Sequence, residues 1–459
     1  MNLIFLTIEV KSRELISKLF FILSNINQKF FFIIGDKKAI ERATNYFGKG
    51  IYFYKSINDN DTKHIQRIKK KGNLYVSLDE EGGYALSNDD IFLSFLKYRS
   101  NSKNVELVDR VYTWGSFDHR IWSKKYSNFK KKFKKTGAPR LDLWRSDVYK
   151  NYFDKDIKKI NRKHGSFIFI PSSFYSSDRD LRKAISNSKK LKKSQTTLSL
   201  KRRIDAQKYN YSIFKNFLQM VKKLSLDFPK ENIIIKPHPS EDISNWKSQI
   251  NFVKYKNIIV EDEFDITAYI AASKCVIFNS SIAGAQAVIM GKRAISYGDV
   301  KKDKSLRNFS NFCTKQAKNY KVLKNELKKI NNRDNYRNKN QNIKYIKQRL
   351  HLTSKSSSKL IIEDIKELIL KNNIKNNLNL EKVKFLSVFF LFWDYFLLFL
   401  SKIKNLFFKR NFSNIGDYIR KMGSGINKNE ILIFFEKMKL KNSVKIIKFS
   451  RSGYIIFKK

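Results

Sequence analysis

Short apolar runs alternate with segments of helical periodicity along the first third of the chain. Between the first two runs, Leu15, Leu19 and Leu23 recur at the spacing of one helix face. This alternation predicts a parallel sheet flanked by helices. The runs expected to form its strands are residues 3–8, 30–34, 50–54, 74–77 and 110–114.

The same alternation starts again near residue 165. An apolar run at 167–171 predicts a new first strand, and an apolar stripe over 213–224 predicts a helix before the run at 233–235. A second α/β domain is therefore expected. Its remaining elements are expected to be strands at 258–260, 275–278 and 293–296 and a helix at 284–290.

The length of 459 residues exceeds one ordinary hydrophobic core, and the pattern suggests two domains followed by a tail. The expected domains are residues 1–150 and 160–371, and the tail is residues 372–459. Within these bounds, residues 322–371 have the pattern of charged helices that close the second domain. An Asn-rich linker at 372–380 opens the tail.

The tail contains an apolar and strongly aromatic segment, residues 385–400, with Asp394 inside it and lysines on both sides. The segment is shorter than the roughly twenty residues that span a bilayer. Aromatic residues in a basic frame are typical of a helix lying at the membrane interface, so residues 385–410 are expected to contact the inner-membrane surface. Docking of the same helix on the protein's own core is the alternative.

The formal net charge is +53, with 94 Lys and Arg against 41 Asp and Glu. Lys, Asn, Ile and Phe are abundant along the whole chain and only 5 residues are Pro, a profile that A/T-rich codon usage produces without any polyanionic partner. The alternatives are an anionic membrane surface and nucleic acid. Nucleic acid is disfavoured, because basic runs such as 130–132 and 189–193 lack zinc-finger, RNP or helix-turn-helix context.

Cysteine usage and the N-terminal residues bear on the compartment. Cys275 and Cys313 are the only two cysteines, which excludes a disulfide framework and indicates a reducing compartment. Residues 1–10 are apolar, but Glu9 and Glu14 follow without a basic leader or a small-residue cleavage site, so we expect a first strand and not a signal peptide. These features predict a cytoplasmic protein.

The most informative segment is Lys236-Pro237-His238-Pro239, which directly follows an apolar run. Ligands of open α/β sheets bind at the carboxyl ends of strands, and the two prolines restrict the backbone so that His238 stays in the loop. Its imidazole could donate a hydrogen bond to a phosphate oxygen, with Lys236 supplying positive charge. A histidine satisfied within a turn is the alternative.

Ser280 and Ser281 follow the expected strand 275–278 and open a helix that contains Gly284 and Gln286. Hydroxyls and free backbone N–H groups at a helix N-terminus can bind an anion. Ordinary helix capping explains the serines equally well when they are taken alone. Together with His238 they predict a phosphate held between two strand ends.

Asp79, Glu80 and Glu81 follow the expected strand 74–77 and precede two glycines. Three neighbouring carboxylates repel one another, which raises the pKa of at least one and prepares a general base. The glycines allow the sharp turn that would present them. The alternative is a solvated acidic turn.

Six segments stand in a recognisable order: residues 9–15, 78–82, 114–115, 136–142, 236–242 and 296–297. In these segments, over roughly residues 1–300, the chain resembles bacterial surface-carbohydrate (capsule and O-antigen) biosynthesis proteins. More distantly it is similar to bacterial sialyl-, polysialyl- and capsular Kdo transferases, which use CMP-activated acidic sugars. The resemblance implies an α/β glycosyltransferase of the GT-B fold, with two Rossmann-like parallel-sheet domains plus the helical, membrane-associating tail.

The resemblance also implies roles for individual residues. In such transferases the acidic pair before glycine deprotonates the acceptor hydroxyl, which here would be Glu80 or Glu81. The nucleotide phosphate is held by the His-Pro histidine and the serine pair, and the anomeric centre is inverted without a metal ion or another cofactor. The donor-binding residues expected here are Lys236, His238, Ser280, Ser281, Gly284, Gln286 and Arg140.

One position departs from the family pattern, since Gln286 stands where surface-carbohydrate family members usually carry a glutamate. Glutamine can still hydrogen-bond a ribose hydroxyl but brings no charge. The favoured function is transfer from a nucleotide sugar, with a CMP-sugar preferred, to a glycan or lipid-linked glycan. Polyol-phosphate transfer of the CDP-glycerol type is a second possibility, and a catalytically degenerate scaffold protein is a third.

Overall fold

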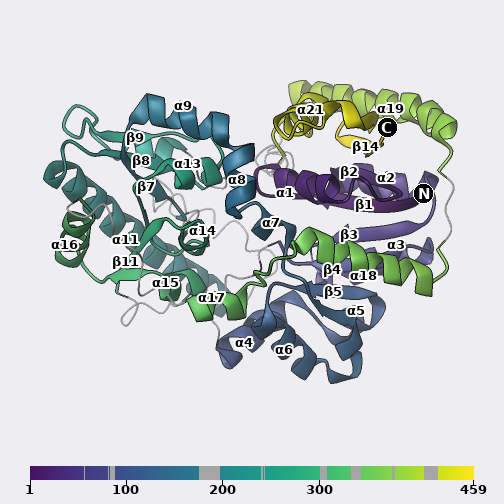
Figure 1. Cartoon of the computed structure of the whole chain (residues 1–459), viewed down its shortest axis with the longest axis horizontal. Coiled ribbons are helices and arrows are strands. Elements are labelled where there is room, and N and C mark those ends of the chain that lie inside the picture. The colour runs from purple at the N-terminus through teal and green to yellow at the C-terminus, as the bar shows by residue number, and fades with distance from the viewer. Residues whose placement is uncertain are drawn as a thin grey trace. The chain divides into compact units, whose positions relative to one another are not determined.

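The computed structural model describes residues 1–55, 57–80, 82, 88–174, 197–238, 241, 243–299, 308–331, 343–374, 378–407 and 422–459. The chain forms two compact units (Figure 1). Unit 1 comprises Met1–Tyr152 and Lys347–Lys459, and unit 2 comprises Phe153–Ile346. Each unit has its own sheet and its own hydrophobic core.

Unit 1 is built on an eight-stranded sheet in the order β13-β14-β2-β1-β3-β4-β5-β6. Strands β1 to β6 run parallel, and the middle ones are apolar on both faces because helices cover both. Leu3, Ile4 and Phe5 of β1 are all fully buried. The strands are β1 (Asn2–Ile8), β2 (Phe30–Asp36), β3 (Gly50–Tyr54), β4 (Leu74–Leu78), β5 (Arg110–Thr113), β6 (Phe133–Lys135), β13 (Val444–Ser450) and β14 (Gly453–Lys458).

The helices of unit 1 divide between the two faces of this sheet. Helices α2, α3, α5, α6 and α19 share one core cluster with Phe31 of β2. Helix α1 contacts α7, α18 and α21, and its Phe21 meets the neighbouring Phe32 on the opposite face. The helices are α1 (Lys11–Ser24), α2 (Lys37–Tyr46), α3 (Thr62–Lys70), α4 (Asp89–Arg99), α5 (Ser102–Leu107), α6 (Ser116–Lys125), α7 (Pro139–Asp142), α8 (Ser146–Tyr152), α18 (Ser357–Lys371), α19 (Leu380–Phe407) and α21 (Lys428–Lys437).

The C-terminal residues belong to unit 1 and do not form a separate tail. Strands β13 and β14 make an antiparallel hairpin, and β14 pairs antiparallel with β2, placing Ile455 opposite Ile33. This pairing satisfies the backbone groups that β2 would otherwise expose at the sheet edge. The division between units therefore differs from the expected domains, because residues 347–371 and the expected tail 372–459 both join unit 1.

Helix α19 contains the aromatic segment and packs against β13. One narrow face docks on the core through Val383 and Phe390, and Asp394 forms an ion pair with Arg42 at 2.9 Å. The opposite face is exposed. Within the described part of the chain, no helix is both long and apolar enough to cross a membrane.

Unit 2 has a six-stranded, fully parallel sheet in the order β12-β11-β10-β7-β8-β9. The two parallel-sheet units confirm the expected α/β fold class. The strands are β7 (Phe167–Pro171), β8 (Asn232–Lys236), β9 (Ile258–Val260), β10 (Cys275–Phe278), β11 (Arg293–Tyr297) and β12 (Lys315–Ala317). The helices are α9 (Asp154–His164), α11 (Thr197–Asp227), α12 (Ile243–Lys247), α13 (Ile266–Ala272), α14 (Ala283–Ile289), α15 (Phe309–Cys313) and α16 (Tyr320–Asn331), with α17 (Ile343–Arg349) crossing the division between units.

The motif at 136–142 anchors α18 within unit 1. Asp142 is buried and accepts hydrogen bonds from the backbone N–H groups of Ser357 and Ser358, at 2.8 and 2.9 Å, and from the Ser358 hydroxyl at 2.7 Å. Gly137 has a φ of 74°, and a Cβ there would lie 2.4 Å from the Ser357 hydroxyl. This part of the motif therefore holds together elements that are more than two hundred residues apart in the sequence.

Asp142→Ala should release the N-terminus of α18, because it removes the acceptor of two backbone N–H groups and one hydroxyl. We expect a loss of roughly 2–3 kcal/mol in local stability. Amide hydrogen exchange followed by mass spectrometry should show α18 exchanging faster. The exposed Asp147 provides the control, and Asp147→Ala should leave α18 protected; equal exchange in both variants would contradict the anchoring role.

Candidate active site

Unit 2 has a topological switch point at its first strand. Strand β7 lies between β10 and β8, so the chain leaves it toward one side and later returns to the other. Ligands of open α/β sheets bind at the carboxyl ends of the strands at such a point. Neighbouring strands lie 4.7–4.9 Å apart, so the ends of β8 and β10 are roughly 10 Å apart. This span suits a sugar phosphate better than a single phosphate oxygen.

The loop after β8 carries Lys236 and His238. His238 is exposed at the carboxyl edge of the sheet, where a ligand can reach it. The ammonium of Lys236 donates to the carbonyl oxygen of Asp262 at 3.2 Å, on the β9 side of the strand. Burial lowers the pKa of Lys236, while Asp262, Asp265 and Glu261 oppose that effect.

Glu241 anchors this loop and was given no separate role by the sequence analysis. Its carboxylate accepts hydrogen bonds from the Ser172 hydroxyl at 2.6 Å, the backbone N–H of Phe174 at 2.5 Å and the indole N–H of Trp246 at 3.0 Å. Burial raises its pKa, against the effect of these donors. Glu241 thus ties the His238 loop to the loop after β7.

The serine pair follows β10 at the same sheet edge. Ser280 and Ser281 are half-buried, and the Ser281 hydroxyl accepts a hydrogen bond from the backbone N–H of Ala283 at 3.2 Å. Gly284 has a packing role, because a Cβ there would lie 2.1 Å from the Phe278 ring. The serines therefore lie across β7 from the His238 loop, and at least one of them also caps a helix.

Gln286 points into the unit. It is 1% exposed, and its amide nitrogen donates to the Thr267 hydroxyl of α13 at 3.0 Å. This geometry joins α13 to α14 and differs from the expected contact with a ribose hydroxyl. The departure from the family pattern thus lies at a position that this structure uses for packing.

Ser172 and Ser173 lie beside the switch point and were missed by the sequence analysis. They directly follow β7, and among the described residues the buried hydroxyl oxygen of Ser173 has no hydrogen-bond partner. The signal in the sequence was a serine pair after an apolar run, the same pattern that drew attention to Ser280 and Ser281.

In unit 1 a network of buried charges lies at the carboxyl edge of the sheet. Glu80 follows β4 and is 5% exposed, and its carboxylate forms an ion pair with the Lys18 ammonium at 3.2 Å. The same ammonium pairs with Glu14 at 3.3 Å and donates to the carbonyl oxygen of Thr7. Glu14 also accepts from the Arg13 guanidinium at 3.0 Å.

The two carboxylates differ in their proton affinity. Burial raises the pKa of Glu80, and the negative charge of Glu14 adds to this, while Lys18 opposes it. Burial also acts on Glu14, but Lys18, the backbone N–H of Glu9 and Arg13 together hold the pKa of Glu14 below its ordinary value. Glu80 is therefore the more basic of the pair, as a general base requires.

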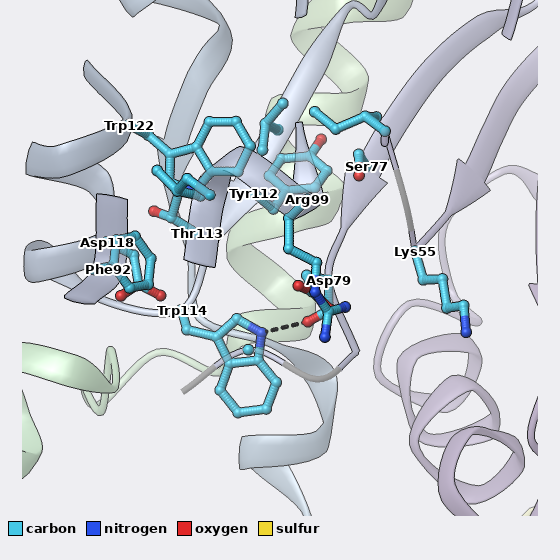
Figure 2. Close-up of a pocket in the computed structure, with 14 residues that line it drawn as sticks. Lys55, Ser77, Asp79, Phe92, Arg99, Tyr112, Thr113, Trp114, Asp118 and Trp122 are labelled. Atoms are coloured by element: carbon cyan, nitrogen blue, oxygen red, sulfur yellow. Dashed lines mark hydrogen bonds and ion pairs between the residues drawn. The ribbon is translucent and has the colours of Figure 1, made fainter. Parts of the chain in front are cut away.

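Asp79 and Gly82 shape the turn that carries Glu80. Trp114 donates its indole N–H to the carbonyl oxygen of Asp79 at 2.6 Å, and the Asp79 carboxylate pairs with Arg99 at 3.3 Å (Figure 2). A Cβ at Gly82 would lie 2.0 Å from the indole nitrogen, so the turn packs directly on this ring. Glu81 lies outside the described residues.

A small cavity of about 30 Å³ lies beside this turn, lined by Asp79, Arg99 and Trp114 among others (Figure 2). Its volume is enough for one or two water molecules and too small for a sugar. Arg140, the remaining predicted site residue, is half-buried on α7, the short helix that contacts α1 and α18. In unit 1 the structure thus brings together the acidic turn, α1 and the end of β1.

Comparison with known proteins gives structural matches only. No protein-family model matches the chain, and no curated protein sequence matches it. The wall teichoic acid polymerase TagF, in a variant soaked with CDPG, superposes with a TM-score of 0.51 at 13% identity, covering 80% of this chain and 90% of that one. The UDP-GlcNAc 2-epimerase from Neisseria meningitidis bound to UDP-GlcNAc gives 0.50 at 10% identity, covering 80% and 100%.

The likeness shows the fold. A second TagF variant, with a TM-score of 0.50 at 12% identity, agrees with it. The expected GT-B arrangement of two Rossmann-like domains is thereby confirmed. The identities are too low to carry over any substrate or reaction.

Proposed function

We propose that the protein is an inverting, metal-independent glycosyltransferase of bacterial surface polysaccharide biosynthesis. Its donor is a nucleotide-activated sugar, with a CMP-linked acidic sugar favoured, and its acceptor is a glycan or lipid-linked glycan. The observation that carries the proposal is the buried Glu80, whose pKa is raised at the carboxyl edge of the unit 1 sheet. A carboxylate in that setting suits proton abstraction from a sugar hydroxyl.

The reaction follows from the residues of both units. Ionised Glu80 or the adjacent Glu81 accepts the proton of the acceptor hydroxyl, whose oxygen attacks the anomeric carbon and forms the new glycosidic bond. The bond from that carbon to the phosphate oxygen breaks, and the nucleotide leaves with its electron pair. His238, Ser280 and Ser281 donate hydrogen bonds to the departing phosphate, with Lys236 contributing positive charge.

The remaining predicted residues have supporting roles in this proposal. Asp79 holds the base-bearing turn through Arg99 and Trp114. Gly284 lets α14 approach β10 closely, which sets the position of the serine pair. Arg140 is proposed to contact the donor, as the family pattern suggests. Gln286 is more plausible as a helix-packing residue than as a ribose contact.

Transfer of a polyol phosphate from a CDP-linked donor is the second candidate, and the structural likeness to TagF favours it. Here the acceptor oxygen would attack phosphorus, and a nucleoside monophosphate would leave. A scaffold protein without turnover is the third candidate. The enzyme is proposed to act at the cytoplasmic face of the inner membrane, with residues 385–410 toward the lipid.

Intact-mass analysis of an acceptor after incubation with nucleotide donors should show a gain of whole sugar residues. A gain of phosphopolyol units would support the second candidate, because that chemistry leaves phosphorus on the product. Calorimetry with CMP, CDP, UDP and GDP provides the complementary measurement. Binding of none of these nucleotides would favour the scaffold and count against both enzymes.

Substitutions at the two ends of the reaction should separate chemistry from binding. Glu80→Gln or Glu81→Gln should lower turnover by about 100-fold or more while nucleotide affinity stays the same, since a base acts on the acceptor alone. His238→Ala should weaken nucleotide affinity by about tenfold. Glu106→Gln, at an exposed position of the same unit, is the control; unchanged turnover in both Glu80 and Glu81 variants removes the proposed base.

The pH dependence of transfer should report on Glu80. The base must be ionised, so kcat/KM should rise with pH through the raised pKa of Glu80. Lys18→Met removes the positive charge that lowers this pKa, so the acid limb should move to higher pH. An acid limb that stays in place would show that Glu80 does not titrate in the rate-determining step.

A further inference from the structure

The exposed face of α19 is a continuous apolar stripe. Phe385 is 78% exposed, Phe392 is 66% exposed and Phe399 is 59% exposed, and the intervening positions 388, 389 and 396 are also apolar and exposed. These positions recur every three or four residues and so lie on one side of the helix. A stripe of this kind on a protein surface marks a contact with a partner or with lipid.

The rotation of α19 is set by a polar contact on its inner face. The Asp394 carboxylate pairs with Arg42 at 2.9 Å and accepts hydrogen bonds from the Ser450 hydroxyl at 2.8 Å and the backbone N–H of Arg451 at 3.0 Å. These partners come from α2 and from the end of the β13–β14 hairpin. The charge inside the aromatic segment therefore faces the protein, and the stripe faces outward.

A groove of about 630 Å³ lies beside the stripe, between α2, the C-terminal end of α3 and α19. Four cations and one carboxylate line it, together with aromatic side chains of α19. The cations are Lys38, Arg42, Arg67 and Lys71, and the carboxylate is Glu41.

Two of these cations have no anionic partner in the described residues. Arg67 pairs with Glu41 at 2.6 Å, and Arg42 pairs with Asp394. Lys71 donates to the Thr44 hydroxyl at 3.1 Å, and Lys38 is exposed without a hydrogen-bond or ion-pair partner in the described part of the chain. The groove thus offers two uncompensated ammonium groups to an anion.

Trp393 connects the groove to the stripe. It lines the groove and is 43% exposed, and its indole N–H has no acceptor among the described residues. An indole with an apolar body and an unused donor is suited to the boundary between headgroups and acyl chains. The polar and apolar requirements of one lipid molecule are therefore met side by side.

We propose that this groove binds the phosphate headgroup of an anionic phospholipid while the α19 stripe inserts among the acyl chains. The inference rests on the proposed membrane-side location of the enzyme and deepens it by naming the face and the lipid. A second copy of the chain is a poorer occupant, because each copy carries a formal net charge of +53 and the groove adds local positive charge. An anionic bilayer complements both features.

The full-length protein can be tested with vesicles of phosphatidylcholine alone and of phosphatidylcholine mixed with phosphatidylglycerol. Trp393 is the exposed tryptophan, since the other four, Trp114, Trp122, Trp144 and Trp246, are at most 8% exposed. We expect flotation with the anionic vesicles and a blue shift of tryptophan emission. Trp393→Phe should abolish the shift and keep flotation.

Charge reversal should identify the headgroup site. Lys38→Glu with Lys71→Glu should lower the apparent affinity for anionic vesicles by about tenfold or more. The matched control is Lys159→Glu with Lys230→Glu, which changes net charge equally at exposed positions of unit 2. Charges away from the bilayer are screened by salt, so the control should lose less than about threefold.

Three outcomes would overturn the proposal. Equal losses in the two double variants would remove the groove as the site, and equal binding to both vesicle types would remove the anionic headgroup. A concentration-dependent dimer that buries Trp393 in the absence of lipid would make a second copy the occupant. Transfer to a soluble acceptor should be normal in the Lys38 and Lys71 variant, so failure of lipid binding and failure of the proposed chemistry remain distinguishable.

Discussion

One ammonium group, that of Lys18, lies between two buried carboxylates at the carboxyl edge of the unit 1 sheet. Without it, Glu14 and Glu80 would face each other across a desolvated site, an arrangement that favours protonation of at least one. With it, Glu14 stays ionised and Glu80 keeps a raised pKa. The candidate base therefore depends on a lysine from the first helix of the chain.

Unit 2 meets a related constraint with a single carboxylate. Glu241 is buried and neutralised by no cation, but it accepts hydrogen bonds from two loops that end neighbouring strands. The loop bearing His238 thereby has its position set from within the unit. In both units a buried carboxylate organises the edge of the sheet at which ligands of such folds bind.

Helix α19 combines two properties that the sequence presents as alternatives. Docking on the protein's core and contact with a membrane looked mutually exclusive for residues 385–400, but a helix has enough circumference for both. Asp394 belongs to the docked face, where Arg42 and the C-terminal hairpin satisfy it. The charge that argued against burial in lipid is thus spent on the protein side.

The sequence by itself determined the strands, because apolar runs bounded by polar residues must be buried on both faces; four expected strands, including 50–54 and 275–278, match the observed bounds. It also indicated the two α/β domains and the acidic and His-Pro loops at strand ends. Only the tertiary structure decided that β14 completes the first sheet, that Lys18 meets Glu80, and that Gln286 packs against Thr267. These contacts join residues far apart along the chain, and local periodicity contains no information about which distant segment supplies a strand's neighbour or a buried charge's partner.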